Sequence, residues 1–163
     1  NTIDSVTKSR YMERLAFLIS NFTPTTVECE RYNPGKADAL YMSASNYLRE
    51  HTRDVKEYPL IFKENIAYGF SRNLRAFKSL GVFIAVSSLL VSSLAIYLDA
   101  PNLSAMSYRE VVQGIPFTHY GLVIIHLSII GVWVFLVTKE WVKIRAFAYA
   151  KRLYAACEKM AVV

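Results

Sequence analysis

The residue with the clearest chemical potential is His126, which lies in an uncharged, apolar stretch at residues 121–137. An ionisable side chain at membrane depth is a candidate proton relay, haem ligand or channel-lining group. The alternative is a neutral imidazole that hydrogen-bonds a serine of another helix. Four serines of a second apolar stretch could be that partner: Ser87, Ser88, Ser92 and Ser93. We expect the neutral, hydrogen-bonded arrangement.

A second histidine, His119, precedes His126 by about two helical turns, so both would lie on similar faces of one helix. The two axial ligands of a b-type haem approach opposite faces of the porphyrin. One helix does not easily supply both, and a second chain would have to complete the pair. Haem ligation or proton relay therefore stands as the alternative function.

Motifs for hydrolysis, nucleotide binding and metal binding do not occur in the sequence. It has no GxSxG, HExxH, P-loop or dinucleotide fingerprint. Cys29 and Cys157 lie far apart and form no CxxC or Cys/His cluster, which gives zinc and iron–sulfur sites no support. We expect two free, buried thiols, no catalytic, metal or cofactor site, and no enzymatic activity.

Two long apolar stretches must position these residues. Residues 79–98 contain no Asp, Glu, Lys or Arg, and neither do residues 111–138. A helix over the first stretch would be roughly 30 Å long, the thickness of a bilayer's hydrocarbon core. Soluble helices normally keep a polar face. We therefore expect transmembrane helices at 81–98 and 119–138, paired as a hairpin, rather than two buried helices of a soluble bundle.

Small and polar residues recur along both stretches. Such residues let helices approach closely, and their interhelical hydrogen bonds contribute about 0.6–2 kcal/mol. We predict an oligomer or pore interface that contains Ser87, Ser88, Ser92, His126 and Gly131. A polar pore lining is the more specific form of this hypothesis.

The chain carries 19 Lys and Arg against 13 Asp and Glu, a net charge of +6. Six cations flank the apolar stretches and are predicted to contact lipid headgroups: Arg72, Arg75, Lys78, Lys139, Lys143 and Arg145. The loop at 99–118 has few charges, so the positive-inside rule places both termini in the cytoplasm and this loop outside. Nucleic-acid binding is not favoured, because these cations form no separate basic face.

The remaining segments are predicted to be helical. We expect a cytoplasmic helical region at 1–57, a juxtamembrane helix at 58–80, an outer loop at 99–118 and a cytoplasmic helical extension at 139–163. Residues 3–22 and 36–53 show helical periodicity. In the first of these segments Leu15, Leu18, Ile19 and Phe22 follow helical spacing. In the second, an apolar stripe is expected to face the core or an interface: Ala37, Leu40, Tyr41, Ala44 and Leu48. No Gly or Pro follows Gly131, so one helix is expected from about 118 to 160.

The chain begins at Asn1, with no Met and no signal segment, so we expect that Asn1 is not the translated start. The apolar end at residues 160–163 is likewise expected to be cut off.

One part of the sequence resembles a known group of proteins. Asn33-Pro34, Thr52-Arg53-Asp54 and Glu64-Asn65-Ile66-Ala67-Tyr68-Gly69-Phe70-Ser71-Arg72-Asn73 resemble segments of uncharacterised bacterial inner-membrane proteins from mobile elements. The likeness covers less than a third of the chain. The overall plan is also similar to that of two-transmembrane effectors of bacterial antiphage systems. The resemblance implies a bacterial inner-membrane location and transfers no functional residue.

Together these features predict an all-α integral membrane protein with a two-helix hairpin and helical cytoplasmic flanks. We expect a non-enzymatic subunit, bound to the lipid bilayer, that forms a homo-oligomer or anchors a complex. In bacterial defence it would perturb a membrane or form a pore. The alternative is a small subunit of a redox or proton-translocating membrane enzyme with His126 as ligand or relay. A third hypothesis is a tether for a soluble partner, in which the hairpin serves only as an anchor.

Overall fold

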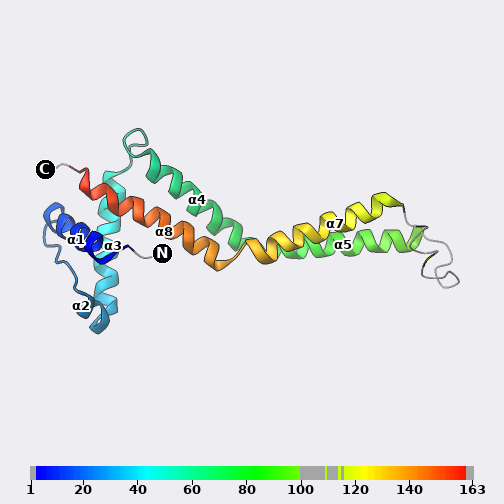
Figure 1. The fold of residues 1–163 in the computed structure, drawn as a ribbon, viewed down its shortest axis with the longest axis horizontal. Helices are drawn as coiled ribbons and strands as arrows, with labels where there is room; N and C mark the ends of the chain where they lie inside the picture. Colours follow the sequence, from blue (N-terminus) through cyan, green and yellow to red (C-terminus); the bar gives the residue numbers. More distant parts are fainter. Residues whose placement is uncertain (1–2, 100–108, 110–113, 115, 161–163) are drawn as a thin grey trace. The chain divides into compact units, whose positions relative to one another are not determined.

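The computed structural model describes residues 3–99, 109, 114 and 116–160. Over these residues the chain is helical and contains no β-strand, which confirms the predicted all-α class. The chain divides into two compact units (Figure 1). The first unit comprises Asn1–Phe70 and Lys143–Val163, and the second comprises Ser71–Val142. We call the first the helical unit and the second the hairpin unit.

Polar side chains cap the first three helices of the helical unit. Its elements are α1 (Ser5–Leu18), α2 (Val27–Tyr32), α3 (Pro34–His51), the first part of α4 (Pro59–Ala76), most of α8 (Lys139–Ala155) and the 3₁₀ turn η3 (Ala156–Glu158). Asp4, Thr26 and Asn33 cap the first three helices, because each side-chain oxygen accepts a hydrogen bond from a backbone N–H three residues later. Proline opens both α3 and α4, where its missing N–H costs nothing.

Residues of both segments with helical periodicity enter the core of the helical unit. Leu15 of α1 and Leu48 of α3 are fully buried, and Phe22 is nearly so. They pack in one cluster with Leu153 of α8 and Cys157 of η3. The helix predicted over 3–22 is shorter than expected, because α1 ends at Leu18 and Ile19 is extended. Phe22 therefore reaches the core from the connecting segment.

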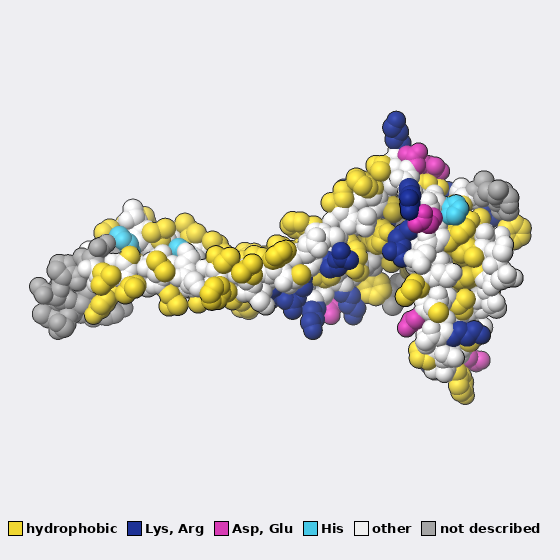
Figure 2. All heavy atoms as spheres, turned by 180° about the vertical axis from the view of Figure 1, so that it is seen from behind, with side chains coloured by type: hydrophobic (Ala, Val, Ile, Leu, Met, Phe, Trp, Pro, Cys, Tyr) yellow, Lys and Arg dark blue, Asp and Glu magenta, His cyan; other side chains and the backbone are white. Residues whose placement is uncertain are grey.

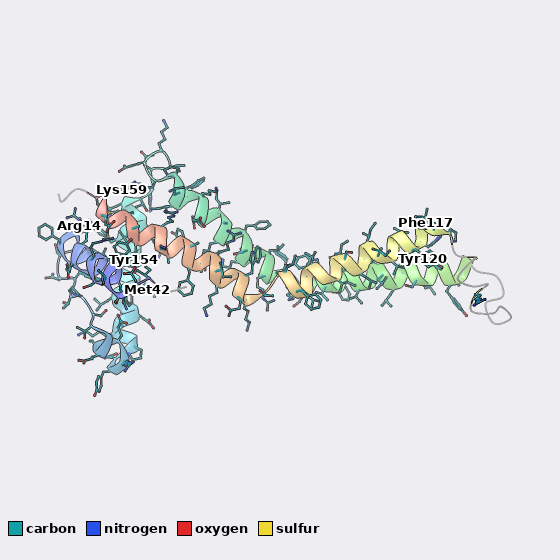
Figure 3. The ribbon with its side chains drawn as sticks, in the orientation of Figure 1. Arg14, Met42, Phe117, Tyr120, Tyr154 and Lys159 are labelled. Carbon is teal, nitrogen blue, oxygen red and sulfur yellow. The ribbon has the colours of Figure 1, made fainter. Side chains whose placement is uncertain are left out.

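The end of the described chain is held by a side chain of α1. Arg14 donates from Nε to the carbonyl oxygen of Cys157 at 3.2 Å and from Nη2 to that of Met160 at 2.7 Å. The labels of Arg14 and Lys159 in Figure 3 mark this place. These bonds satisfy carbonyls that the helix end would otherwise leave without donors.

The prediction of two buried thiols is wrong for one of them. Both cysteines are free, as expected, but Cys29 is exposed on α2 and only Cys157 is buried. A short helix over Val27–Tyr32 was not predicted, and it holds Cys29 on its surface. Burial raises the pKa of the Cys157 thiol to about 11.

The hairpin unit contains the two long apolar helices. α5 (Lys78–Asp99) and α7 (Phe117–Gly131) lie side by side, and a π-helical turn, η2 (Val132–Leu136), continues α7 (Figure 1). Two helical segments, Lys78–Leu98 and Phe117–Leu136, are long and apolar enough to cross a membrane. On the face shown in Figure 2, hydrophobic side chains run along the hairpin, and no Lys or Arg interrupts them.

The side chains between the two helices follow the spacing of coiled-coil packing. On each helix one series of half-buried or buried side chains alternates three and four residues apart, which is the pattern of helices that pack along one seam. We call these residues the hairpin seam: Val82, Ala85, Leu89, Ser92 and Ile96 of α5, and His119, Val123, His126, Ile130 and Trp133 of α7 and η2.

The single helix predicted from about 118 to 160 is wrong. It breaks at Val137, whose backbone angles are φ −82° and ψ 74°, and α8 starts anew at Lys139. The Thr138 hydroxyl caps the new helix by accepting from the backbone N–H of Trp141 at 3.1 Å. The earlier helix, in contrast, runs almost continuously from α4 into α5, with a single turn residue at Phe77.

Candidate functional site

A polar pair joins the two apolar helices of the hairpin. The Ser88 hydroxyl of α5 lies 2.7 Å from Nε2 of His126 on α7. The hydrogen bond expected between this histidine and a serine of the first apolar stretch is therefore present. Ser88 is exposed and His126 half-buried, so the pair lies at the edge of the hairpin seam.

Both ring nitrogens of His126 have hydrogen-bond partners. Nδ1 lies 2.7 Å from the carbonyl oxygen of Leu122, which can only accept. Nδ1 therefore donates to this oxygen, and Nε2 shares the second hydrogen bond with the Ser88 hydroxyl.

The other residues predicted at the interface occupy different positions. Ser92 lies in the hairpin seam, whereas Ser87 lies on the other side of α5 by helical geometry. A Cβ placed on Gly131 would meet nothing within 4 Å, so this glycine is not needed for packing within the hairpin. The Ser93 hydroxyl donates to the carbonyl of Leu89 in its own helix at 2.8 Å. The structure thus joins Ser88 to His126 and leaves Ser87 and Gly131 apart from them.

His119 also lies in the seam, near the start of α7. Its Nδ1 is buried and has no hydrogen-bond partner among the described residues. His119 and His126 both belong to α7, so the two histidines do not face each other across the hairpin.

Lys78 ties the two ends of the hairpin together. Its ammonium donates to the carbonyl oxygens of Val134 at 2.9 Å and Val137 at 3.0 Å. The π-helical turn and the break at Val137 leave these carbonyls without the usual helical donors. Lys78, predicted to contact headgroups, thus has an internal role that its sequence position did not reveal.

Beside this clamp, the helices meet at Gly81 and Trp133. A Cβ on Gly81 would lie 2.3–2.7 Å from three atoms of the Trp133 indole, closer than real Cβ atoms come. Gly81 is therefore the position at which α5 admits the indole. Because Gly81 and Lys78 are one helical turn apart, the clamp and the aromatic contact reinforce each other.

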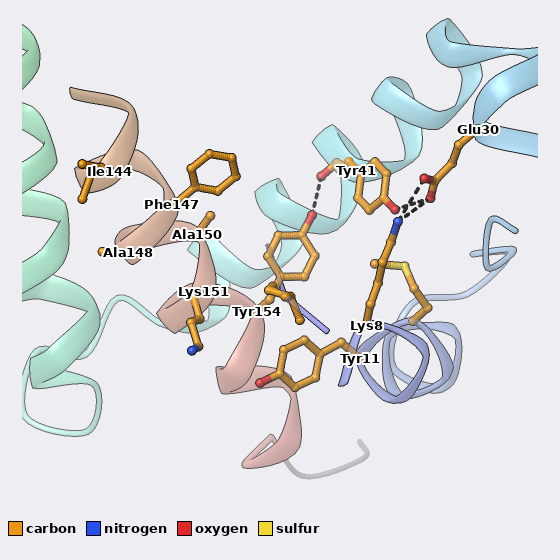
Figure 4. Close-up of a pocket in the computed structure, with 12 residues that line it drawn as sticks. Lys8, Tyr11, Glu30, Tyr41, Ile144, Phe147, Ala148, Ala150, Lys151 and Tyr154 are labelled. Carbon is orange, nitrogen blue, oxygen red and sulfur yellow. Dashed lines mark hydrogen bonds and ion pairs between the residues drawn. The ribbon is translucent and has the colours of Figure 1, made fainter. Parts of the chain in front are cut away.

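The helical unit contains a second candidate site that sequence analysis missed. A cleft of about 590 Å³ opens between α1, α3 and α8 (Figure 4). On one side Lys8 donates to both carboxylate oxygens of Glu30, at 2.9 and 3.0 Å. The Tyr41 hydroxyl donates to the same carboxylate. The Tyr41 and Lys8 hydrogen bonds hold the pKa of Glu30 below its ordinary value, although burial opposes them.

Helical periodicity did mark Tyr41 as part of an apolar stripe, but no sequence signal relates it to Lys8 or to α8. Tyr154 of α8 donates to the Tyr41 carbonyl at 3.1 Å, and Ser45 lies at the same distance from the Tyr154 hydroxyl. These contacts link residues more than a hundred positions apart in the chain. They explain why only the fold could reveal the cleft.

Comparisons of the chain with protein families, with curated proteins and with solved structures gave no match. The functional interpretation therefore follows from the chain's own residues and their geometry.

Proposed function

We propose that this chain is a non-enzymatic membrane subunit whose hairpin crosses a lipid bilayer and associates with further copies. The observation that carries the proposal is the exposure of the hairpin's apolar side chains. Only 6% of the first candidate span and none of the second is buried. Leu90, Val91 and Phe135, for example, are 64%, 68% and 77% exposed. A core helix of a soluble protein has the same composition but is mostly buried.

The energetic argument favours lipid or protein around this surface. Each fully buried Val, Leu, Ile or Phe side chain contributes about 1.5–3 kcal/mol relative to its exposed state. Monomeric soluble proteins rarely leave continuous apolar patches of more than a few hundred Å² in water. A bilayer covers both helices along their full length, because each is about as long as the hydrocarbon core is thick.

The charges support one orientation. The Lys78 clamp brings the first residues of α5 and the last residues of η2 together, so the cations next to them gather at one end of the hairpin. Arg75 and Lys139 belong to this end within the hairpin unit. By the positive-inside rule, this end and both termini face the cytoplasm. The resemblance noted for residues 33–73 motivates the bacterial inner membrane as the location.

Self-association is proposed through the Ser88–His126 pair and the small residues near it. The pair lies at an exposed edge, where a hydroxyl oxygen keeps acceptor capacity toward a second chain. Polar side chains at membrane depth normally find protein partners. In this account the assembly anchors or perturbs the membrane, in line with the resemblance to antiphage effectors. The redox alternative is less favoured, because a ligand role for His126 would require breaking one of its two hydrogen bonds.

The test replaces Ser88 with leucine and follows both insertion and assembly. Ser88→Leu should leave the protein in carbonate-washed membranes but shift it to smaller particles on a native gel. Ser93→Leu is the matched control, because the Ser93 hydroxyl donates within its own helix, to the Leu89 carbonyl, and not to the described part of α7. An unchanged particle size for Ser88→Leu would refute association through this pair. Loss of both variants from the membrane fraction would refute the hairpin as a membrane anchor.

A further inference from the structure

We propose that the cleft of the helical unit binds a single-chain amphiphile with an acidic head group, such as a fatty-acid carboxylate. The cleft lies between α1, α3 and α8, within one compact unit. Its volume of about 590 Å³ falls in the range of pockets that enclose small organic ligands. This binding activity does not depend on whether the hairpin associates with other copies.

One wall of the cleft is apolar and open. Ile144, Phe147 and Ala148 line it from α8, at spacings that place them on one helix face (Figure 4). Ile144 is 51% and Phe147 43% exposed, although both border the cleft. Ile3 and Met12 line it from the side of α1. A chain of methylene groups lying in the cleft would cover these side chains and remove their surface from water.

The charges of the cleft select an anion. Three ionised side chains line it: Lys8, Glu30 and Lys151. Lys8 and Glu30 neutralise each other through their ion pair. Lys151 is exposed and makes no ion pair or hydrogen bond with any described residue. It follows Phe147 by one helical turn, so its side chain leaves α8 on the same face as the apolar wall.

These two properties define the ligand. The apolar wall requires a hydrocarbon part, and the uncompensated ammonium favours a carboxylate or another acidic group at one end. A neutral hydrocarbon would leave Lys151 unused. A cationic amphiphile would place two like charges together beside an apolar surface, which is unfavourable.

The experiment uses the full chain in nanodiscs of phosphatidylcholine, whose headgroup carries no net charge. Laurate with a photoreactive diazirine near the end of its chain is added, and crosslinked peptides are located by mass spectrometry. We expect adducts on peptides from α1 and from residues 144–154. Unlabelled laurate should displace the probe, and dodecyltrimethylammonium, which has the same chain length and the opposite charge, should not.

Two variants of α8 give a matched comparison. Lys151→Gln should weaken laurate binding about three- to fivefold, as expected for loss of one partly exposed ion pair. Arg152→Gln removes the same charge from the next residue, which does not line the cleft, and should leave binding unchanged. Ala148→Phe should fill the cleft and reduce labelling more than tenfold. Circular dichroism checks whether Ala148→Phe folds. If it does not, the comparison of Lys151→Gln with Arg152→Gln decides whether the cleft binds laurate.

A last arm separates two sources of the same chemistry. In discs that contain acidic phosphatidylglycerol, unchanged laurate labelling of α8 is expected for a single-chain ligand. Weaker labelling would identify the two-chain bilayer lipid as the occupant and would overturn the single-chain assignment. The proposal is overturned if adducts occur only on peptides of the hairpin. It is equally overturned if dodecyltrimethylammonium competes as well as laurate, or if Lys151→Gln and Arg152→Gln have the same effect.

Discussion

Substitution of Gly81 by alanine tests the packing of the hairpin with a single methyl group. A Cβ at this position would lie 2.3, 2.4 and 2.7 Å from three atoms of the Trp133 indole. Either the ring moves or the helices separate at the end that Lys78 clamps.

The expected loss combines two opposing effects. Overpacking of this kind typically costs about 1–3 kcal/mol. Replacing Gly by Ala inside a helix gains about 0.5–1 kcal/mol from helix propensity. The net destabilisation is therefore about 0–2.5 kcal/mol. Its middle value, about 1.2 kcal/mol, lowers the melting temperature by roughly 2–5 °C. Gly131→Ala is the control, because nothing lies within 4 Å of its added methyl, and it should be neutral or stabilising.

The assay is thermal unfolding in dodecyl maltoside, followed by the fluorescence of Trp133 in a Trp141→Phe background. Trp133 emission should change in Gly81→Ala and not in Gly131→Ala. Adding Trp133→Leu should restore most of the stability lost in Gly81→Ala, since the pair is in direct contact. This double variant is followed by circular dichroism. The packing argument is refuted if Gly81→Ala unfolds at or above the temperature of Gly131→Ala.

Three further predictions concern single side chains. Lys78→Met should speed hydrogen exchange of the backbone at 132–138, because two carbonyls of the break lose their donor; unchanged exchange would contradict the clamp. Iodoacetamide at pH 8 should alkylate the exposed Cys29 and spare Cys157, whose pKa is raised by burial to about 11; peptide mapping reads the ratio, and equal labelling would count against the buried site. The hydrogen bond from the Tyr41 hydroxyl lowers the pKa of Glu30 in the folded state. The ionised carboxylate therefore stabilises the fold fully above the unfolded-state pKa near 4.5, and this stabilisation is lost as the pH falls through the lower pKa of the folded state. Glu30→Gln should remove this part of the acid sensitivity in thermal unfolding between pH 3 and 7, and an identical pH profile would contradict the prediction.

The sequence was most informative where one physical effect dominates. Long uncharged stretches predict apolar helices because no other regular structure buries so many consecutive apolar residues. The stripe that contains Leu48 predicted core positions, because helical periodicity alone puts its residues on one face. The break at Val137 escaped prediction, since it contains neither Gly nor Pro. The sequence carries only a weaker signal of this break: a Thr that can cap a new helix, followed by Glu140 in the first turn of that helix.

Of the two candidate sites, one could be predicted from the sequence and the other could not. A histidine at membrane depth needs a hydrogen-bond partner, and the serines of the first stretch were the available donors, so the Ser88–His126 pair could be anticipated. The cleft could not, because Lys8, Glu30 and Lys151 acquire their relation only when α8 packs against α1 and α3. Likewise, the need for glycine at Gly81 follows from the position of Trp133, which no local pattern encodes.

The mass of the purified particle tests the central proposal most directly. Light scattering, corrected for bound detergent, measures the protein mass of the solubilised assembly. The account predicts a whole multiple of the 18.6 kDa chain, two copies or more. That mass should fall in Ser88→Leu and persist in Ser93→Leu. A mass of one chain, or a particle completed by other proteins, would contradict self-association through the hairpin.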